Sequence, residues 1–163
     1  MDRKGVIDIN FGMIFSIILI IAFIFVAFYA IKIFLDFRKC SELGLFKESL
    51  QEKINSAFSN DESSFVFSSS LPSSLNVCFV NFNSNARGED RDLYEEFSVY
   101  TKKSNMFFSP TNKACDGLRD FKIEHINITK ITESKNPYCI KNKKGKVEIK
   151  IEKGFYDSLV HLR

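Results

Sequence analysis

The sequence predicts an α+β protein in which an N-terminal transmembrane helix continues into an amphipathic helix packed on a small antiparallel β-sheet ectodomain. Three observations predict this fold. They are an uncharged apolar run near the N-terminus, an apolar stripe at helical spacing after it, and short segments further along the chain in which apolar and polar residues alternate. The chain has 163 residues and is 45% hydrophobic, with Gly 7 and Pro 3. This composition excludes a disordered, linker-rich or collagen-like chain.

The apolar run covers residues 11–31 and contains no charged side chain. At about 1.5 Å per residue, a helix of this length spans the roughly 30 Å hydrocarbon core of a bilayer. A core helix of a small domain would instead be amphipathic, and a cleaved secretory signal has a shorter apolar region that ends at small residues. We therefore expect a transmembrane helix over 11–31 and a cytoplasmic leader over 1–10.

A second helical pattern follows the apolar run. Apolar residues recur at steps of three and four, which predicts an amphipathic stem helix over 32–58. The first helix of an ordinary small domain would show the same pattern. Gly44 could kink this helix, and the polar stretch from Ser59 to Ser64 ends it. The stripe consists of Phe37, Cys40, Leu43, Phe46, Leu50, Ile54 and Ala57.

Residues 59–163 should form the α+β ectodomain with one antiparallel sheet. The stretch Asp90–Lys103 has its apolar residues on one side and predicts a second helix. Asn142–Gly145 predicts a hairpin turn between the last two strands, with Gly145 at a position that needs positive φ. Strands are predicted at Ser64–Phe67, Asn76–Phe82, Asn105–Ser109, Phe121–Ile128, Tyr138–Lys141 and Lys146–Glu152.

Four cysteines lie behind the apolar run, and none forms a C-x-x-C pair. An even number of separated cysteines indicates two disulfides, which persist in an oxidising compartment and therefore favour an ectodomain outside the cell. Buried thiols in a cytosolic domain are the alternative. Because neighbours in sequence close the shortest loops, we expect the pairs Cys40–Cys78 and Cys115–Cys139.

The N-terminus carries a short motif: Arg3 and Lys4, then Gly5 and Val6, then the apolar helix. It resembles the class III leader of archaeal type IV pilin-like proteins. The resemblance implies that a dedicated peptidase cuts between Gly5 and Val6 and leaves the helix in place. Pilins often carry Glu at the fifth mature position, where this chain has Asn10. The layout is also similar to small single-pass membrane proteins of archaea, a likeness that implies no function.

The sequence contains no arrangement typical of a catalytic site. Its two histidines, His125 and His161, are isolated, and a serine elbow, a phosphate-binding loop and metal-ligand spacings are all missing. We therefore expect a non-enzymatic protein that needs no cofactor and no metal.

Two features could still bind a partner or carry a modification. Asn127 heads an Asn-x-Thr sequon and is a candidate glycosylation site. Lysines gather on the terminal hairpin, either as a basic patch for anionic headgroups or polymers, or as a solvated face that protects a sheet edge. These lysines are Lys141, Lys143, Lys144, Lys146, Lys150 and Lys153.

Taken together, these expectations describe a single-pass protein of the cell membrane whose C-terminal domain lies outside the cell. Its expected function is that of a surface protein of pilin-like design, acting as a structural or adhesion subunit. The alternative is a lone membrane-tethered binding ectodomain that does not polymerise. Its expected partners are the lipid bilayer and other copies of itself or pilin-like subunits. We expect no nucleic acid, because the net charge is only +3.

Overall fold

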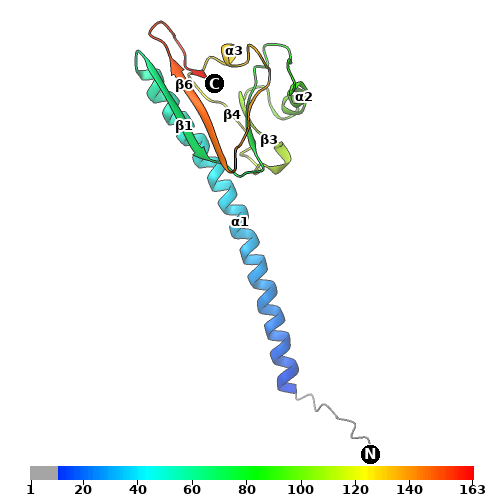
Figure 1. Ribbon diagram of the computed structural model, residues 1–163. Helices are drawn as coiled ribbons and strands as arrows, with labels where there is room; N and C mark the ends of the chain where they lie inside the picture. The colour runs from blue at the N-terminus through cyan, green and yellow to red at the C-terminus, as the bar shows by residue number, and fades with distance from the viewer. Residues whose placement is uncertain (1–10) are drawn as a thin grey trace, which may run out of the picture. The chain divides into compact units, whose positions relative to one another are not determined.

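A computed structural model describes residues 11–163 and has the expected α+β class (Figure 1). The predicted processing site at Gly5 and Val6 lies outside the described residues. The chain divides into two compact units between Arg38 and Lys39. This division falls inside the helix α1, Phe11–Ser59, and inside the predicted stem segment 32–58.

In the first unit, α1 is an apolar helix whose side chains are exposed. Phe11 is 80% exposed and Phe23 is 71% exposed, and no residue of the most apolar window is buried. The Ser16 hydroxyl donates to the Gly12 carbonyl at 2.8 Å, so its polar group is satisfied within the helix. Within residues 11–163, α1 is the one helix long and apolar enough to cross a membrane.

In the second unit, α1 presents its apolar stripe to the core. Leu43, Phe46, Leu50, Ile54 and Ala57 are all fully buried, which confirms this part of the predicted stripe. The helix continues through Gly44.

The stripe was predicted to begin too early. Phe37 is 71% exposed and belongs to the first unit, so the buried face starts only behind it.

The strands form two antiparallel sheets, where the sequence predicts one. One sheet has the order β1-β6-β7 and the other has the order β4-β3-β2-β5. The strands are β1 Ser63–Ser70, β2 Asn76–Phe79, β3 Met106–Ser109, β4 Asp120–Phe121, β5 Tyr138–Ile140, β6 Lys146–Lys153 and β7 His161–Leu162. A 3-10 turn, η1 Thr111–Lys113, follows β3, and a short helix, α3 Ile128–Ile131, precedes β5.

The turn at Asn142–Gly145 forms as expected but does not make a hairpin of paired strands. Lys144 and Gly145 have φ values of 55° and 86°, the positive values of a type I′ turn. Strands β5 and β6, which the turn connects, nevertheless belong to different sheets. The turn therefore passes the chain from one sheet to the other.

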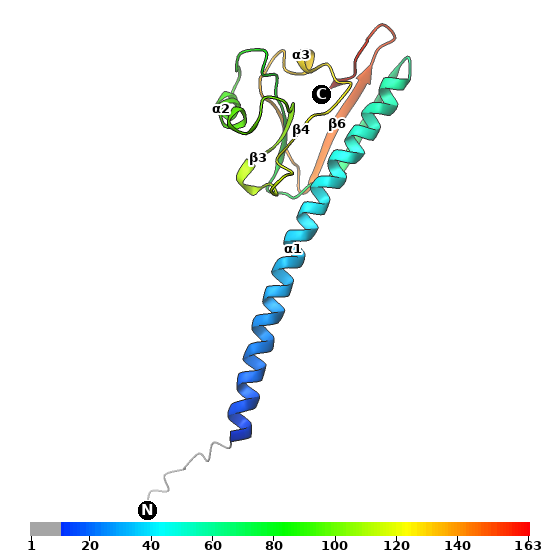
Figure 2. The ribbon, with the colours of Figure 1, turned by 180° about the vertical axis from the view of Figure 1, so that it is seen from behind.

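The sheet containing β2 and β3 is buried on both faces. Val77 and Phe79 join the main core with the second half of α1, whereas Cys78 and Phe107 face the opposite side. There the helix α2, Arg91–Tyr100, places Phe97 against Phe107, with ring centroids 4.6 Å apart. Figure 2 shows α2 and the second half of α1 on opposite sides of this sheet. The helix predicted at Asp90–Lys103 is thus confirmed.

The strand predicted at Phe121–Ile128 is wrong beyond its first residue. The Asn105 side chain instead bonds the backbone of Ile123, donating to its carbonyl at 2.8 Å and accepting from its N–H at 2.7 Å. The Glu124 N–H donates to the Gln51 side chain at 3.0 Å. Because side chains satisfy these backbone groups, the segment needs no neighbouring strand.

The predicted disulfide pairing is also wrong. The structure joins Cys40 to Cys115, between α1 and the loop behind η1, and Cys78 to Cys139. Cys78 and Cys139 are direct cross-strand partners in the register of β2 and β5. Loop length alone favours sequence neighbours, but strand pairing decides which sulfur atoms meet.

Non-reducing peptide mapping tests this pairing. We expect linked peptides containing Cys40 with Cys115 and Cys78 with Cys139. Replacing Cys40 and Cys115 together by Ser should lower the free energy of unfolding by about 2–4 kcal/mol, because the unfolded chain regains the freedom of a long loop. Peptides joining Cys40 to Cys78 would contradict the observed topology.

Gly44 offers a test of the helix. A Cβ added at Gly44 meets no atom within 4 Å, and Gly44 lies inside α1. Gly44→Ala should therefore raise the free energy of unfolding by about 1 kcal/mol, as measured by chemical denaturation. Gly145→Ala is the matched control and should be destabilising, because Gly145 has φ +86°. A stabilising Gly145→Ala would contradict the turn geometry.

Candidate functional site

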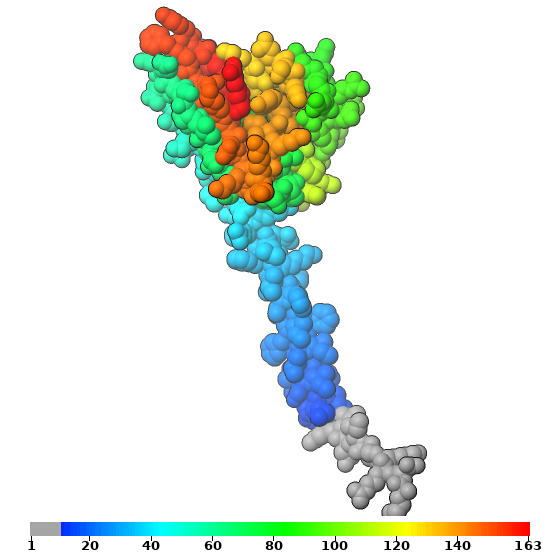
Figure 3. All heavy atoms as spheres, viewed as in Figure 1, coloured from blue at the N-terminus to red at the C-terminus, as the bar shows by residue number. Residues whose placement is uncertain are grey.

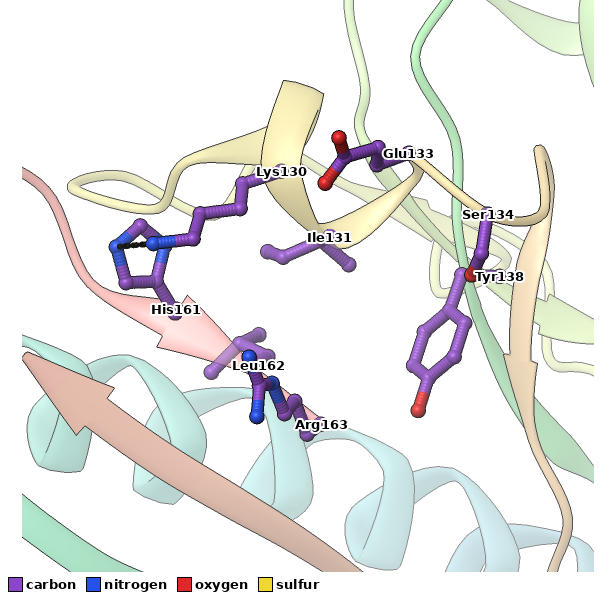
Figure 4. A pocket seen from close by; sticks show the side chains of 8 residues that line it. All are labelled: Lys130, Ile131, Glu133, Ser134, Tyr138, His161, Leu162 and Arg163. Atoms are coloured by element: carbon purple, nitrogen blue, oxygen red, sulfur yellow. Dashed lines mark hydrogen bonds between the residues drawn. The ribbon is translucent and has the colours of Figure 1, made fainter.

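A pocket of about 380 Å³ lies between α3, the loop behind it, β5 and β7 (Figure 4). Lys130 and His161 lie on one side of the pocket, and Tyr138 lies on the other. Lysine and arginine side chains supply positive charge, whereas Ile131 and Leu162 supply apolar surface. The lining residues are Lys130, Ile131, Glu133, Ser134, Tyr138, His161, Leu162 and Arg163.

His161 is the polar centre of this pocket. Its side chain is 9% exposed, and Nε2 lies 3.1 Å from Asp157 Oδ2 and 3.2 Å from Lys130 Nζ. Asp157 and His161 are four residues apart in the sequence, and the loop that connects β6 to β7 brings their side chains together.

Asp157 is held in place by its own loop. The Gly154 N–H donates to Asp157 Oδ2 at 2.9 Å. This hydrogen bond, followed by the contact with His161, holds the pKa of the Asp157 carboxyl below its ordinary value of 3.8. The carboxylate therefore stays ionised and orients the imidazole beside the Lys130 ammonium.

The arrangement can hydrogen-bond a polar group, and its lining combines the cations Lys130 and Arg163 with the carboxylate of Glu133. His161 Nδ1 is buried and has no hydrogen-bond partner among the described residues, so it could still donate to or accept from a ligand. Ser134 lines the pocket, but no hydrogen bond joins it to His161 in the described part of the chain. Residues 11–163 also contain no cluster of His, Cys, Asp or Glu that could hold a metal.

His125 takes no part in this site. It adopts a positive φ of 65° and stacks on the Phe58 ring, with centroids 4.0 Å apart, near the C-terminal end of α1. The two histidines thus serve different parts of the second unit.

The predicted lysine patch is divided by the structure. Lys153 donates to the backbone carbonyls of Phe58 and Asn60 at 2.8 and 2.6 Å, so it closes the C-terminal end of α1. Lys150 pairs with Glu152 at 2.5 Å and thereby lowers the pKa of that carboxyl. The remaining four lysines lie around the turn, where Lys141, Lys143 and Lys146 line a second cavity of about 310 Å³.

The edge-protection alternative does not hold for the lysines of β6, whereas Lys141 directly follows β5, an edge strand of the other sheet. Strand β6, which carries Lys146, Lys150 and Lys153, is the central strand of its sheet. The edge strands of this sheet are β1 and β7, and β1 contains no charged residue.

The sequon residue Asn127 serves as the N-cap of α3. Its side-chain oxygen accepts from the Lys130 N–H at 3.0 Å, and the residue is partly exposed. The same cap therefore begins the helix that delivers Lys130 to the pocket. Glycosylation at Asn127 stays a prediction.

Sequence reasoning missed Asn136, a fully buried side chain just before β5. Its Oδ1 accepts from the Asn81 N–H at 3.0 Å, and its Nδ2 donates to the Asn81 carbonyl at 2.9 Å. Nδ2 also contacts Ser84, so one amide orders the loop behind β2. The Asn136-Pro137 dipeptide indicates a turn, but nothing local indicates a buried hydrogen-bonding hub.

Comparisons with known proteins provide no relative: no family model, no curated protein and no solved structure matches the chain.

The acid response of Asp157 is a testable consequence. The fold lowers the pKa of the Asp157 carboxyl, so the ionised carboxylate stabilises the folded state at any pH above the ordinary value of 3.8. This stabilisation is lost as the pH falls through the lower pKa of the folded state. Asp157→Asn should therefore be less stable than the parent chain at neutral pH, with a difference that narrows below about pH 4. Urea denaturation at several pH values measures it. A difference that is constant across pH would exclude a role for the charge.

Proposed function

We propose that this chain is a membrane-anchored, non-enzymatic surface protein of pilin-like design that acts as a structural or adhesion subunit. In this proposal residues 11–31 span the cell membrane, and the domain that begins near Lys39 lies outside. The observation that carries the proposal is the first part of α1, where every apolar side chain is exposed. An exposed helix that is apolar all round requires lipid or other copies of itself around it.

The chemistry of the second unit supports the outside location. All four cysteines are paired in disulfides. Disulfides persist in oxidising compartments and are rare in the cytosol. Within the second unit, the Cys40–Cys115 bond also ties α1 to the loop behind η1, where it would resist unfolding of the stem.

The build of the stem supports the pilin-like design. One helix provides both an apolar segment and an amphipathic segment that packs on antiparallel sheets. The Arg3-Lys4-Gly5 motif adds a processing site of the pilin type in front of it. Small residues in the apolar segment, such as Gly12 and Ala22, would permit helices of neighbouring copies to approach.

The pocket around His161 favours the second candidate, a tethered binding ectodomain that does not polymerise. A pocket of about 380 Å³ lined by a buried histidine, two cationic side chains and the Glu133 carboxylate is large enough for a small polar ligand. A single copy of the protein could bind such a ligand without assembling with other copies.

The mass of the mature protein tests the pilin-like proposal. We expect intact-mass measurement of the native protein to show a chain beginning at Val6. Gly5→Leu should retain residues 1–5, because the bulky side chain blocks the processing site, while the disulfides stay unchanged. Protease added to intact cells should degrade the domain after Lys39.

Two outcomes would contradict the proposal. A parent chain that begins at Met1, like the Gly5→Leu chain, would remove the pilin-like processing and favour the tethered binding ectodomain. Full protection of the domain from external protease would remove the outside location.

A further inference from the structure

Strand β1, Ser63–Ser70, forms an edge of its sheet that no other strand covers. It pairs with β6 on one side, and no described residue hydrogen-bonds its other side. Its sequence, SSFVFSSS, contains no charge and no proline, the usual protections of an exposed edge. Figure 3 shows atoms in the colour of β1 at the surface of the second unit, beside those of β6.

The direction of the free backbone groups follows from the pairing on the far side of β6. Lys150 exchanges two hydrogen bonds with Arg163, at 2.7 and 2.9 Å, so its N–H and C=O point away from β1. Val66 lies opposite Lys150 in the register. In an antiparallel pair the backbone groups of such a position both point outward, so the N–H and C=O of Val66 face the free edge.

The alternation of the strand extends this result to its neighbours. Ser64 and Ser68 stand two positions either side of Val66, so their backbone groups face the same edge. The side chains of all three residues are exposed, and Val66 is 61% exposed despite being apolar. This edge is thus an uncharged row of unpaired donors and acceptors with one exposed apolar side chain at its centre.

The sequence of the edge is symmetric about Val66. Residues 63–69 read SSFVFSS, which is the same in both directions. If two copies of the strand pair antiparallel with Val66 at the two-fold axis, Val66 meets Val66, Ser64 meets Ser68, and Phe65 meets Phe67. Every position then faces a residue of its own kind, and no charges oppose each other.

We propose that the free edge of β1 is a self-association surface, on which β1 of a second copy pairs antiparallel with Val66 facing Val66. The pairing joins two three-stranded sheets into one continuous sheet and forms about six backbone hydrogen bonds across the axis. It uses the second unit alone and does not depend on the membrane segment or on the pilin-like proposal. One strand pair buries little surface compared with the roughly 1,200–2,000 Å² that stable complexes bury. Covalent trapping, which detects weak association, is therefore the suitable test.

Disulfide trapping of the full chain in detergent micelles tests the register. Val66→Cys supplies the only free thiol, because all four native cysteines are paired. Hydrogen-bonded antiparallel partners have Cα atoms about 5.5 Å apart, which suits a disulfide. We expect Val66→Cys chains to form a linked dimer at least about fivefold faster than the Val99→Cys control, because β1 pairing raises the local thiol concentration. Val99 is 82% exposed on α2 and reports random collision.

The serine positions provide a sharper control. In the proposed register Ser64 faces Ser68 of the other copy, whereas two Ser64 positions lie about 13 Å apart along the strands. Ser64→Cys and Ser68→Cys chains should therefore cross-link when mixed and stay near the Val99→Cys level when each is alone. Dimer formation by Val66→Cys no faster than by Val99→Cys overturns the proposal. Self-linkage of Ser64→Cys as fast as that of Val66→Cys overturns the register.

Val66→Glu tests the interface without a cysteine at the axis. In one chain the new carboxylate faces Lys150 on β6, so the fold should keep its denaturation midpoint. Across the axis two carboxylates would meet, and cross-linking of the mixed Ser64→Cys and Ser68→Cys chains should fall at least about fivefold when both carry Val66→Glu. The matched Val99→Glu change should leave it unaltered. Undiminished cross-linking with Val66→Glu would contradict the proposed pairing.

Discussion

The second half of α1 is the packing constraint on which the rest of the domain depends. Leu43, Phe46, Leu50, Ile54 and Ala57 are fully buried and form one face of the main core. Burying a large apolar side chain contributes about 1.5–3 kcal/mol, so this stripe is a large part of the stability of a small domain. Both sheets bury apolar residues in the same core, and without the helix those faces would be exposed to water.

This packing also determines where the polar features lie. The Cys40–Cys115 bond attaches the loop behind η1 to one end of the buried helical segment, and the hydrogen bonds from Lys153 to Phe58 and Asn60 attach the end of β6 to the other. The pocket around His161 lies between α3 and the strands β5 and β7. A site built from loops on such a framework can bind a ligand without disturbing the core.

Two surfaces have no partner within the described part of the chain, the first part of α1 and the free edge of β1, and they differ in chemistry. The first part of α1 is apolar without backbone groups to pair, and it suits lipid or another apolar helix. The edge of β1 has unpaired backbone groups and little apolar area, and it suits another strand. In the function and the strand pairing that we propose, one contact would form within the membrane and a different contact between domains.

The sequence by itself determined what depends on local periodicity: the apolar helix, the buried stripe from Leu43 to Ala57, the helix α2 and the turn at Gly145. Residue spacing sets these features whatever lies nearby. Only the tertiary structure decided the division into two sheets, the Cys78–Cys139 partnership and the meeting of Lys130, Asp157 and His161. Each of these three features joins segments that are distant along the chain or linked by an irregular loop. The atoms of these segments meet because of strand register and loop path, which short-range sequence patterns do not encode.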